Sequence, residues 1–347
     1  MTGMTTEAEE MKDADYPELR LFRVEHQLAP DGEKDDCQGR WLVCTPKNLY
    51  DFSAVGFVFG RRLHKELNVP VGMIQSTWGG THAESWTKMS VMKNNPLYAD
   101  VLEDFALKNV KQEKGYCKVP ATLWNGMIHP ILGYTVKGNI WYQGESNAHN
   151  WEAHEKLFKL LVNSWRKNWN DACLPFYYVQ LSSLNRPSWP WFRESQRRML
   201  NEISHIGMAV SSDHGDSLDV HPICKKPVGE RLARGALNKT YQKNVIPSGP
   251  LFRGANVRGG KVFLSFDYGK GMRSSDGKPL QCFEVAEYDG IYYPATAEVV
   301  GDQVKVYSKE VPNPRYVRYG WQPFTRANLI NREGLPASTF RAEFSMK

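Results

Sequence analysis

Short apolar runs alternate with amphipathic helical patterns through the first two thirds of this 347-residue chain. The runs expected to form strands are 19–24, 41–44, 71–77, 136–142, 175–181 and 206–210, of which 71–77 and 136–142 are expected to be buried. The helices expected between and after them cover 52–67, 96–110, 151–169, 189–203 and 228–241. Strands that alternate with helices in this way favour a parallel sheet covered by helices. We therefore expect an α/β fold.

The helix expected over 52–67 has the clearest pattern, because its apolar residues recur at intervals of three and four. Asp51 is the expected N-cap, and Asn68 with Pro70 should end the helix. Gly56 and Gly60 lie four residues apart on it. That spacing permits close packing of the helix on the sheet.

The composition changes at residue 246, where a Pro-Ser-Gly-Pro segment resembles a linker. Beyond it, short alternating runs are separated by glycine and aspartate turns, which is typical of antiparallel strands. We expect a first domain over 1–245 and a β-rich accessory region over 246–347.

The stretch from Ile140 to Ala148 follows the expected strand 136–142 and changes abruptly to small and polar residues. In open α/β sheets, ligands bind beyond the carboxyl ends of the strands. Gln143, Glu145 and Asn147 would then lie at the mouth of a site. This stretch alone leaves a plain polar loop as the alternative.

A second strand end, 71–77, continues into Trp78, Gly79, Gly80 and Thr81. Two successive glycines let the backbone approach another group closely. Their N–H groups could hold an anion or a developing oxyanion. A tight turn between strand and helix is the alternative.

The loop 211–222 follows the strand 206–210 and contains three aspartates and two histidines. It could supply a general base and the acid that orients it. A metal-dependent hydrolase built on Asp213, His214, Asp216 and His221 is disfavoured, because calcium and zinc loops have firmer spacing. We expect no metal site.

Composition narrows the partners. The net charge is +6, but the charges are interspersed, so a nucleic-acid partner is disfavoured. No apolar run approaches the length of about 18 residues that suggests a membrane span. The 11 Trp and 16 Tyr suit sugar stacking, and they also suit large cores and interfaces. We expect no cofactor.

The six cysteines are widely scattered and include no pair at zinc-binding spacing. Cys37 and Cys44 could pair across a short loop in an oxidising compartment, and free thiols are equally compatible with the sequence. The first residues are acidic and polar, and no signal peptide is visible.

Three stretches taken together resemble the sialate O-acetylesterase family of carbohydrate esterases, within the SGNH-hydrolase fold group. They are residues 76–81 (STWGGT), 141–148 (WYQGESNA), and 219–222 (DVHP) with Lys225 and 229–233 (GERLA). The similarity extends to 15–17, 20–22, 52–56, 317–321 and 331–338. It covers nearly everything from about residue 15 to 341.

This resemblance implies a doubly wound parallel sheet with β accessory parts, and removal of O-acetyl groups from sugars or glycans by a serine nucleophile. It implies His221 as the base and Asp219 as the acid beside it. Asp216, in the same loop, is the alternative acid. It implies backbone N–H groups of Gly79 or Gly80 in the oxyanion hole, shared with the side chain of Gln143.

The expected site lining comprises Trp78, Glu145, Asn147 and Arg193. Relatives of this kind suggest a secreted, periplasmic or lysosomal protein. The oligomeric state is left open by the sequence.

One departure affects the activity. The family carries its nucleophile in a Gly-Gln-Ser-Asn-Met block before the counterpart of 15–17, and this sequence contains no such block. None of Ser76, Ser146 and Ser212 lies in a Gly-x-Ser-x-Gly elbow. We expect a sialate 9-O-acetylesterase-like site whose serine is absent from this chain, through truncation or loss. An inactive carbohydrate-binding remnant is the alternative.

Overall fold

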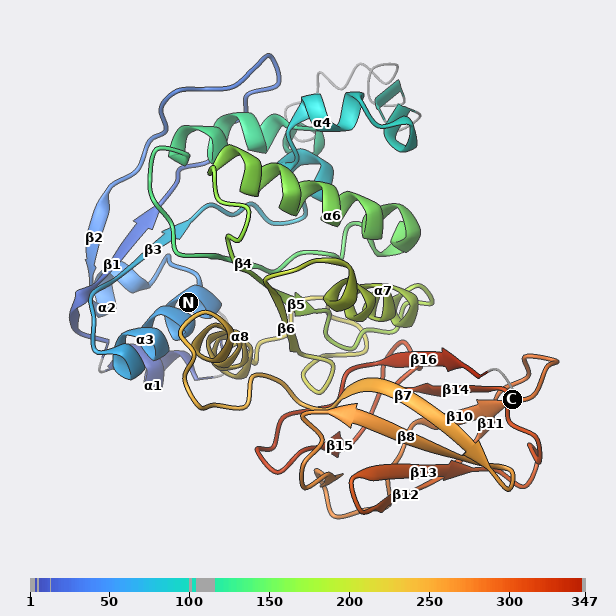
Figure 1. Cartoon of the computed structure of the whole chain (residues 1–347). Helices are drawn as coiled ribbons and strands as arrows, with labels where there is room; N and C mark the ends of the chain where they lie inside the picture. The colour runs from blue at the N-terminus through green and yellow to red at the C-terminus, as the bar shows by residue number, and fades with distance from the viewer. Residues whose placement is uncertain (1–3, 5, 13, 100–101, 104–115, 345–347) are drawn as a thin grey trace. The chain divides into compact units, whose positions relative to one another are not determined.

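The computed structural model describes residues 4, 6–12, 14–99, 102–103 and 116–344. The chain is an α/β protein with parallel strands flanked by helices, followed by antiparallel sheets (Figure 1). It divides into two compact units. The first comprises 1–177, 201–206 and 223–233, and the second comprises 178–200, 207–222 and 234–347. The domain boundary expected between 245 and 246 stays a prediction.

The first three-stranded sheet has the order β2-β1-β3. Its strands are β1 (Tyr16–Arg23), β2 (Trp41–Cys44) and β3 (Val71–Gln75). β1 pairs antiparallel with β2 and parallel with β3, so that Leu21 lies opposite Leu42 on one side and Met73 on the other. The predicted strands 19–24, 41–44 and 71–77 are therefore all present.

The second three-stranded sheet has the order β4-β5-β6. Its strands are β4 (Asn139–Trp141), β5 (Phe176–Gln180) and β6 (Ile206–Val210). Every residue of β5 and β6 is buried, as expected for strands covered on both faces. β4 is shorter than the predicted run 136–142, because only 139–141 have strand geometry.

The helices of the described residues that Figure 1 labels are α1 (Glu7–Lys12), α2 (Pro46–Leu49), α3 (Ala54–Leu67), α4 (Met89–Lys93), α6 (Trp151–Asn168), α7 (Trp189–Glu202) and α8 (Lys226–Lys239). Short helical turns are η1 (Ala83–Trp86), η2 (Pro96–Tyr98), η3 (Tyr116–Lys118), η4 (Trp124–Ile128), η5 (His129–Ile131) and η6 (Ala148–Asn150). Of the helix predicted over 96–110, residues 96–98 form η2 and 102–103 are helical, whereas 100–101 and 104–110 lie outside the described residues. No helix in the described part of the chain has the length and apolarity needed to cross a membrane.

Helix α3 begins and ends by side-chain and backbone capping. The N-cap is Ser53, whose Oγ accepts a hydrogen bond from the Gly56 N–H at 3.1 Å, so the prediction of Asp51 was wrong. Asn68 ends the helix in the left-handed conformation, as predicted. A Cβ on Gly60 would lie 2.7 Å from Met73 Cγ. The predicted close approach of this helix to the sheet is therefore confirmed.

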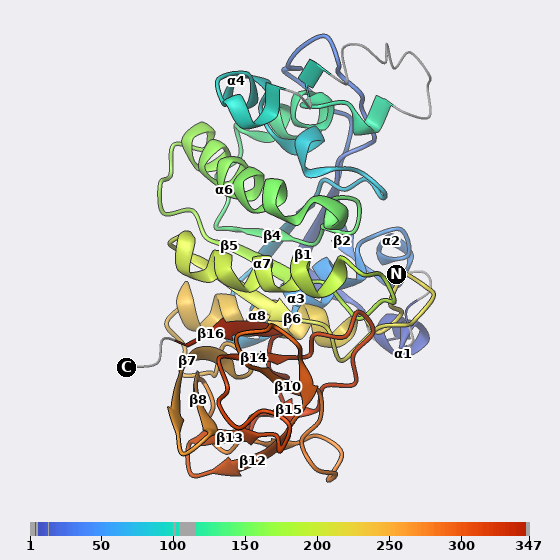
Figure 2. The ribbon, with the colours of Figure 1, turned by 90° about the vertical axis from the view of Figure 1, so that its right-hand side faces the viewer.

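The second compact unit contains two four-stranded antiparallel sheets, in the orders β12-β13-β8-β7 and β11-β10-β14-β16, and a short β15-β9 pair. The strands are β7 (Leu251–Arg258), β8 (Lys261–Asp267), β9 (Arg273–Ser274), β10 (Phe283–Ala286), β11 (Tyr293–Pro294), β12 (Thr296–Val300), β13 (Gln303–Tyr307), β14 (Tyr316–Tyr319), β15 (Leu329–Ile330) and β16 (Phe340–Glu343). Figure 2 shows them from a second side. The predicted antiparallel region is present.

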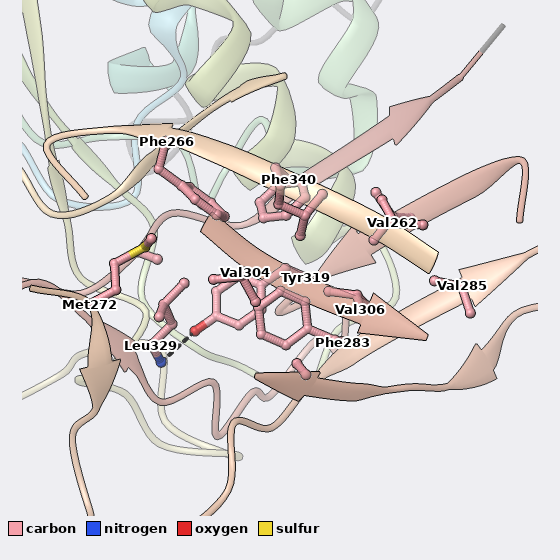
Figure 3. Packing of buried hydrophobic residues seen from close by; sticks show 14 of the residues in the cluster. Val262, Phe266, Met272, Phe283, Val285, Val304, Val306, Tyr319, Leu329 and Phe340 are labelled. Atoms are coloured by element: carbon pink, nitrogen blue, oxygen red, sulfur yellow. Dashed lines mark hydrogen bonds between the residues drawn. The ribbon is translucent and has the colours of Figure 1, made fainter. Parts of the chain in front are cut away.

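Inward-facing residues of both four-stranded sheets form one apolar core (Figure 3). Val304 from one sheet and Phe283 from the other are buried in it. Tyr319 is also fully buried, and its hydroxyl accepts a hydrogen bond from the Leu329 N–H at 2.8 Å. Burial raises the pKa of Tyr319 above its ordinary value, so this hydroxyl stays protonated.

All six cysteines are free thiols, so Cys37 and Cys44 do not pair in this structure. Cys44 is buried at the end of β2, and burial raises the pKa of its thiol to about 12. A thiol with so high a pKa is a weak nucleophile. Cys44 therefore acts as a small core residue.

Glu33 connects three parts of the first unit. Its carboxylate accepts a hydrogen bond from Trp124 Nε1 at 2.9 Å and pairs with Lys88 Nζ at 2.9 Å and with His129 Nε2 at 3.4 Å. Burial raises the pKa of Glu33. The hydrogen bonds from Trp124 and Lys88 and the charge of His129 lower it by more, so the pKa lies below its ordinary value. The folded state therefore favours the ionised carboxylate.

We predict that close packing between α8 and α3 leaves no room for a side chain larger than that of glycine at position 229. A Cβ on Gly229 would lie 2.7 Å from Val58 Cβ and 2.9 Å from the Val55 carbonyl oxygen. Gly229→Ala should lower the free energy of unfolding by about 1–2 kcal/mol, because overpacking outweighs the gain in helix propensity. Gly56→Ala is the matched control, because its nearest contact is Ser53 Cβ at 3.3 Å. Urea unfolding compares them, and equal midpoints would contradict this packing.

We also predict a pH dependence for Glu33. A carboxyl group with a lowered folded pKa stabilises the protein above its unfolded pKa of about 4.3, and this stabilisation is lost as the pH falls through the folded value. Wild type should therefore exceed Glu33→Gln in unfolding free energy at pH 7, and the difference should shrink below about pH 4. Urea titrations from pH 7 to pH 3 measure it. A difference that is independent of pH would exclude a stabilising role for the ionised carboxylate of Glu33.

Candidate active site

The diglycine turn follows β3 and presents its backbone to solvent. Gly79 and Gly80 are both exposed, and a Cβ on either would meet no atom within 4 Å. Gly80 has φ +71°, in the left-handed region that favours glycine. Conformation, not crowding, therefore requires glycine at position 80, and the turn leaves open space beside both residues.

Trp78 is held in place by a ring stack at the start of this turn. Its indole lies on the imidazole of His26, with ring centroids 3.9 Å apart and planes 12° apart. His26 Nε2 lies 3.0 Å from the Thr77 carbonyl oxygen, which fixes the orientation of the imidazole. Trp78 is half-buried, so part of its ring is accessible beside the two glycines.

The glutamine loop after β4 is hydrogen-bonded directly to the segment that follows the diglycine turn. Gln143 Nε2 donates to the Thr81 carbonyl oxygen at 3.1 Å and to Asn147 Oδ1 at 2.6 Å. Two of the three stretches singled out in the sequence are thus brought together within one compact unit.

Asn147 forms the centre of this connection. It is buried, and its Oδ1 also accepts a hydrogen bond from the Ala83 N–H at 3.0 Å. Its Nδ2 donates to Glu84 Oε2 at 2.9 Å. A single buried amide therefore joins the glutamine loop to η1, through two bonds to its oxygen and one from its nitrogen. The expectation that Asn147 lines a site stays a prediction.

Gln143 is hydrogen-bonded within the protein, and its predicted oxyanion role stays a prediction. Both of its Nε2 hydrogens have partners, in Thr81 and Asn147, whereas its Oε1 is buried without one. An oxyanion would have to take one of these hydrogens from its present acceptor. Glu145, in the same loop, is half-buried.

The histidine loop lies in the second compact unit and contains a hydrogen-bonded acid–base pair. His221 Nδ1 lies 3.2 Å from Asp219 Oδ1, and the His221 N–H donates to the same oxygen at 2.9 Å. The side chain of His221 is 86% exposed and that of Asp219 is 62% exposed. The local turn of the backbone therefore holds this pair together at the surface. The geometry leaves Nε2 of His221 directed away from its acid.

Asp216, the alternative acid, is hydrogen-bonded to the backbone of its own loop. Its Oδ1 accepts hydrogen bonds from the Leu218 N–H at 2.7 Å and from the Asp219 N–H at 3.1 Å. These bonds lower the pKa of Asp216 and shape the turn that brings Asp219 next to His221. Asp219 is therefore the acid that the structure places beside the histidine.

Arg193 does not fit its expected place in the site. The side chain is fully buried on α7, and its guanidinium donates to the carbonyl oxygens of Pro323, Gly320 and Gln322 at 3.1, 2.9 and 2.7 Å. Burial lowers the pKa of Arg193 to about 9. Arg193 fastens α7 to the segment 320–323, so its role is structural.

The three candidate serines have no base beside them in the described structure. Ser76 Oγ donates to the Met127 carbonyl oxygen at 3.0 Å. Ser212 is buried, and its carbonyl oxygen accepts from Ser183 Oγ. Ser146 is half-buried in the glutamine loop.

Metal-binding clusters of three or more His, Cys, Asp or Glu side chains are absent from the described residues. His214 Nε2 does lie 3.4 Å from Asp213 Oδ2, but as a pair. Two ligands are fewer than a structural or catalytic zinc site requires.

Reasoning from sequence missed the residues that support the site. Thr81 accepts the Trp86 indole N–H at 2.9 Å and donates to the Trp78 carbonyl oxygen at 2.8 Å, which closes the turn. Glu84 anchors Asn147, and His26 orients Trp78. The sequence offered one signal, since Thr81 and Glu84 follow the glycines directly. His26 lies about fifty residues upstream, where no motif marks it.

Comparisons with known proteins agree with this architecture. A family model described as carbohydrate esterase, sialic acid-specific acetylesterase, matches residues 44–238. A crystal structure of a carbohydrate acetylesterase from Xanthomonas citri is 34% identical with a TM-score of 0.89, and the match covers 99% of this chain and 77% of that one. The fold and these matches place the chain in the class of carbohydrate esterases. The chain belongs to the sialic acid-specific acetylesterase family.

Curated relatives give the same result. Sialate O-acetylesterase of Rattus norvegicus is 27% identical over 366 residues, which cover 89% of this chain and 67% of the relative. The Homo sapiens protein is 29% identical, with 84% and 60% covered. The chain thus spans about two thirds of the length of the rat relative and less of the human one.

We predict that Asn147 is required for the local geometry. Asn147→Ala removes the acceptor of the Ala83 N–H and one partner each of Gln143 and Glu84. Unsatisfied buried groups should lower the free energy of unfolding by about 1–3 kcal/mol. Asn94→Ala, at an exposed residue, is the control. Hydrogen exchange of the Ala83 amide should accelerate only in the first variant, and unchanged protection there would refute the role of Asn147.

Proposed function

We propose that this chain carries the base and oxyanion-binding parts of a sialate O-acetylesterase site, which acts on acetyl esters of sugars. The observation that carries this proposal is the hydrogen-bonded connection of Gln143 to Thr81 and Asn147. It holds a side-chain amide next to an open diglycine turn, an arrangement suited to binding a developing negative charge.

In this proposal His221 Nε2 takes the proton of the attacking hydroxyl and then gives it to the departing sugar oxygen. Asp219 holds the imidazole through Nδ1 and stabilises its positive charge in the transition state. N–H groups of Gly79 or Gly80 donate to the oxyanion, together with Gln143. Losing one such donor typically raises the barrier by about 3 kcal/mol.

The family's attacking hydroxyl belongs to a serine in a Gly-Gln-Ser-Asn-Met block. This sequence contains no such block. Ser76 and Ser212 are engaged elsewhere or buried, and neither lies in a nucleophile elbow. Without its serine, such a site keeps only a residual rate of about 10³–10⁴ over water. We therefore propose that this chain alone is a poor esterase.

The proposed substrate is a 9-O-acetylated sialic acid or a related O-acetylated glycan. Two observations support a sugar: the names of the relatives and the accessible ring of Trp78 beside the diglycine turn. The same ring favours the second candidate function, a carbohydrate-binding protein that retains an esterase-like cleft. A partly exposed tryptophan beside polar groups serves binding as well as catalysis.

An assay with an aryl acetate separates the two functions. The purified chain should show at most residual turnover, and His221→Ala should change it less than tenfold, because no aligned hydroxyl depends on this base. Lys347→Ala, at the last residue, serves as the control preparation. Robust turnover that His221→Ala abolishes would show that a serine of this chain is the nucleophile. Absent turnover together with binding of O-acetylated sialic acid would favour the binding function.

A further inference from the structure

A row of charged residues crosses the outer face of the sheet β11-β10-β14-β16. Side chains alternate between the two faces of a strand. The inward row is aromatic and buried, and consists of Phe283, Tyr319 and Phe340, which lie opposite one another in register. One position along, Glu284 on β10 lies opposite Arg318 on β14, and Arg318 lies opposite Arg341 on β16.

The charges in this row do not balance. Glu284 is fully engaged by Arg318, whose Nε and Nη2 donate to its two carboxylate oxygens at 2.9 and 3.0 Å. Arg341 pairs with no carboxylate side chain of the described chain, and it stands directly opposite another arginine. Like charges at paired positions of neighbouring strands are destabilising. A bound anion would remove that cost.

Acids near Arg341 are committed to other partners. Glu194 on α7 accepts a hydrogen bond from the main chain of Arg341, but both of its oxygens bind Arg197, from Nε and Nη2, at 2.7 Å. Glu343, two residues after Arg341, pairs with Arg315 at 3.0 Å. The side chain of Arg341 hydrogen-bonds Tyr292, a neutral phenol, so its positive charge has no carboxylate partner among the described residues.

Aromatic rings surround the arginine row. The Arg341 guanidinium lies 5.2 Å above the Trp191 ring, and Trp191 packs edge-on against Trp321 with centroids 5.0 Å apart. Arg318 lies 3.8 Å above the Tyr292 ring. Trp191 is 36% exposed, so one apolar ring is accessible next to an unneutralised guanidinium.

We propose that Arg341 and Trp191 form a binding site for a sugar that carries a carboxylate, of the sialic acid class. The guanidinium of Arg341 binds the carboxylate through bidentate hydrogen bonds, a geometry that arginine favours. The ring of Trp191 receives the apolar face of the sugar. None of these residues belongs to the proposed ester site, and the carboxylate, not the acetyl group, is what they recognise.

Arg318 neutralises Glu284 and stacks on Tyr292, so it stabilises the sheet. Arg341 also has structural contacts, because its side chain hydrogen-bonds Tyr292 and stacks on Trp191. Neither contact neutralises its charge, and its position opposite Arg318 adds like-charge repulsion. A half-buried guanidinium without a carboxylate partner among the described residues suits an external acid.

Calorimetric titration of the full chain tests this site. The probe is the methyl glycoside of N-acetylneuraminic acid, and its comparison ligand is the same glycoside with the carboxyl group methylated. Wild type should bind the first, and Arg341→Gln should bind it at least about tenfold more weakly through loss of a charge-assisted contact. Trp191→Ala should also weaken binding. Arg315→Gln is the matched control, because Arg315 already has Glu343 as its partner.

Two further measurements make the outcome decisive. Arg341→Gln should unfold at a urea concentration close to that of wild type, because removal of the like-charge pair offsets the loss of its contacts with Trp191 and Tyr292, and Arg315→Gln should leave glycoside binding unchanged. The site is excluded if the methylated glycoside binds equally well, if Arg341→Gln binds like wild type, or if wild type does not bind. Equal competition by free acetate or an acidic peptide would also exclude a sugar site. Failure of ester hydrolysis leaves these results unaffected.

Discussion

The buried side chain of Asn147 is the interaction on which the candidate site depends. One amide accepts from the Ala83 N–H and from Gln143, and donates to Glu84, so it connects a loop after β4 with a turn after β3. A buried amide is stable only when its hydrogen-bonding groups are satisfied. The same bonds that satisfy Asn147 therefore fix the distance between the glutamine loop and the diglycine turn. Catalytic preorganisation of this kind needs rigid support behind the reacting groups.

The histidine loop, residues 211–222, holds its acid–base pair by local hydrogen bonds and not by a buried contact between distant segments. Its acid–base pair is defined by local turn geometry, in which Asp216 caps the backbone and Asp219 bonds both the ring and the N–H of His221. The pair is largely exposed, so water weakens its electrostatic coupling. A loop of this kind can present a base to a substrate without the desolvation that a buried acid–base pair would require.

In the β-rich part of the second unit, one sheet has a stabilising inner face and an outer face that carries the proposed glycan site. Its inner face is an apolar core around Phe283 and Tyr319 (Figure 3). Its outer face carries an arginine row in which the charge of Arg318 is neutralised and that of Arg341 is not. Because strand side chains alternate, changes on the outer row leave the inner packing intact. Glycan recognition on the outer face is therefore compatible with a stable core.

Periodicity in the sequence determined the α/β class, most strand and helix positions and the antiparallel region, because burial on one or two faces leaves a regular apolar pattern. The motifs also pointed to His221, Asp219, Gln143 and the two glycines, whose catalytic roles stay predictions. Tertiary structure alone decided which groups are occupied. It assigned the cap of α3 to Ser53, turned Arg193 into an internal clamp and gave Asn147 its connecting role. Such outcomes depend on hydrogen bonds between residues far apart in the chain, and a local sequence pattern contains no information about those partners.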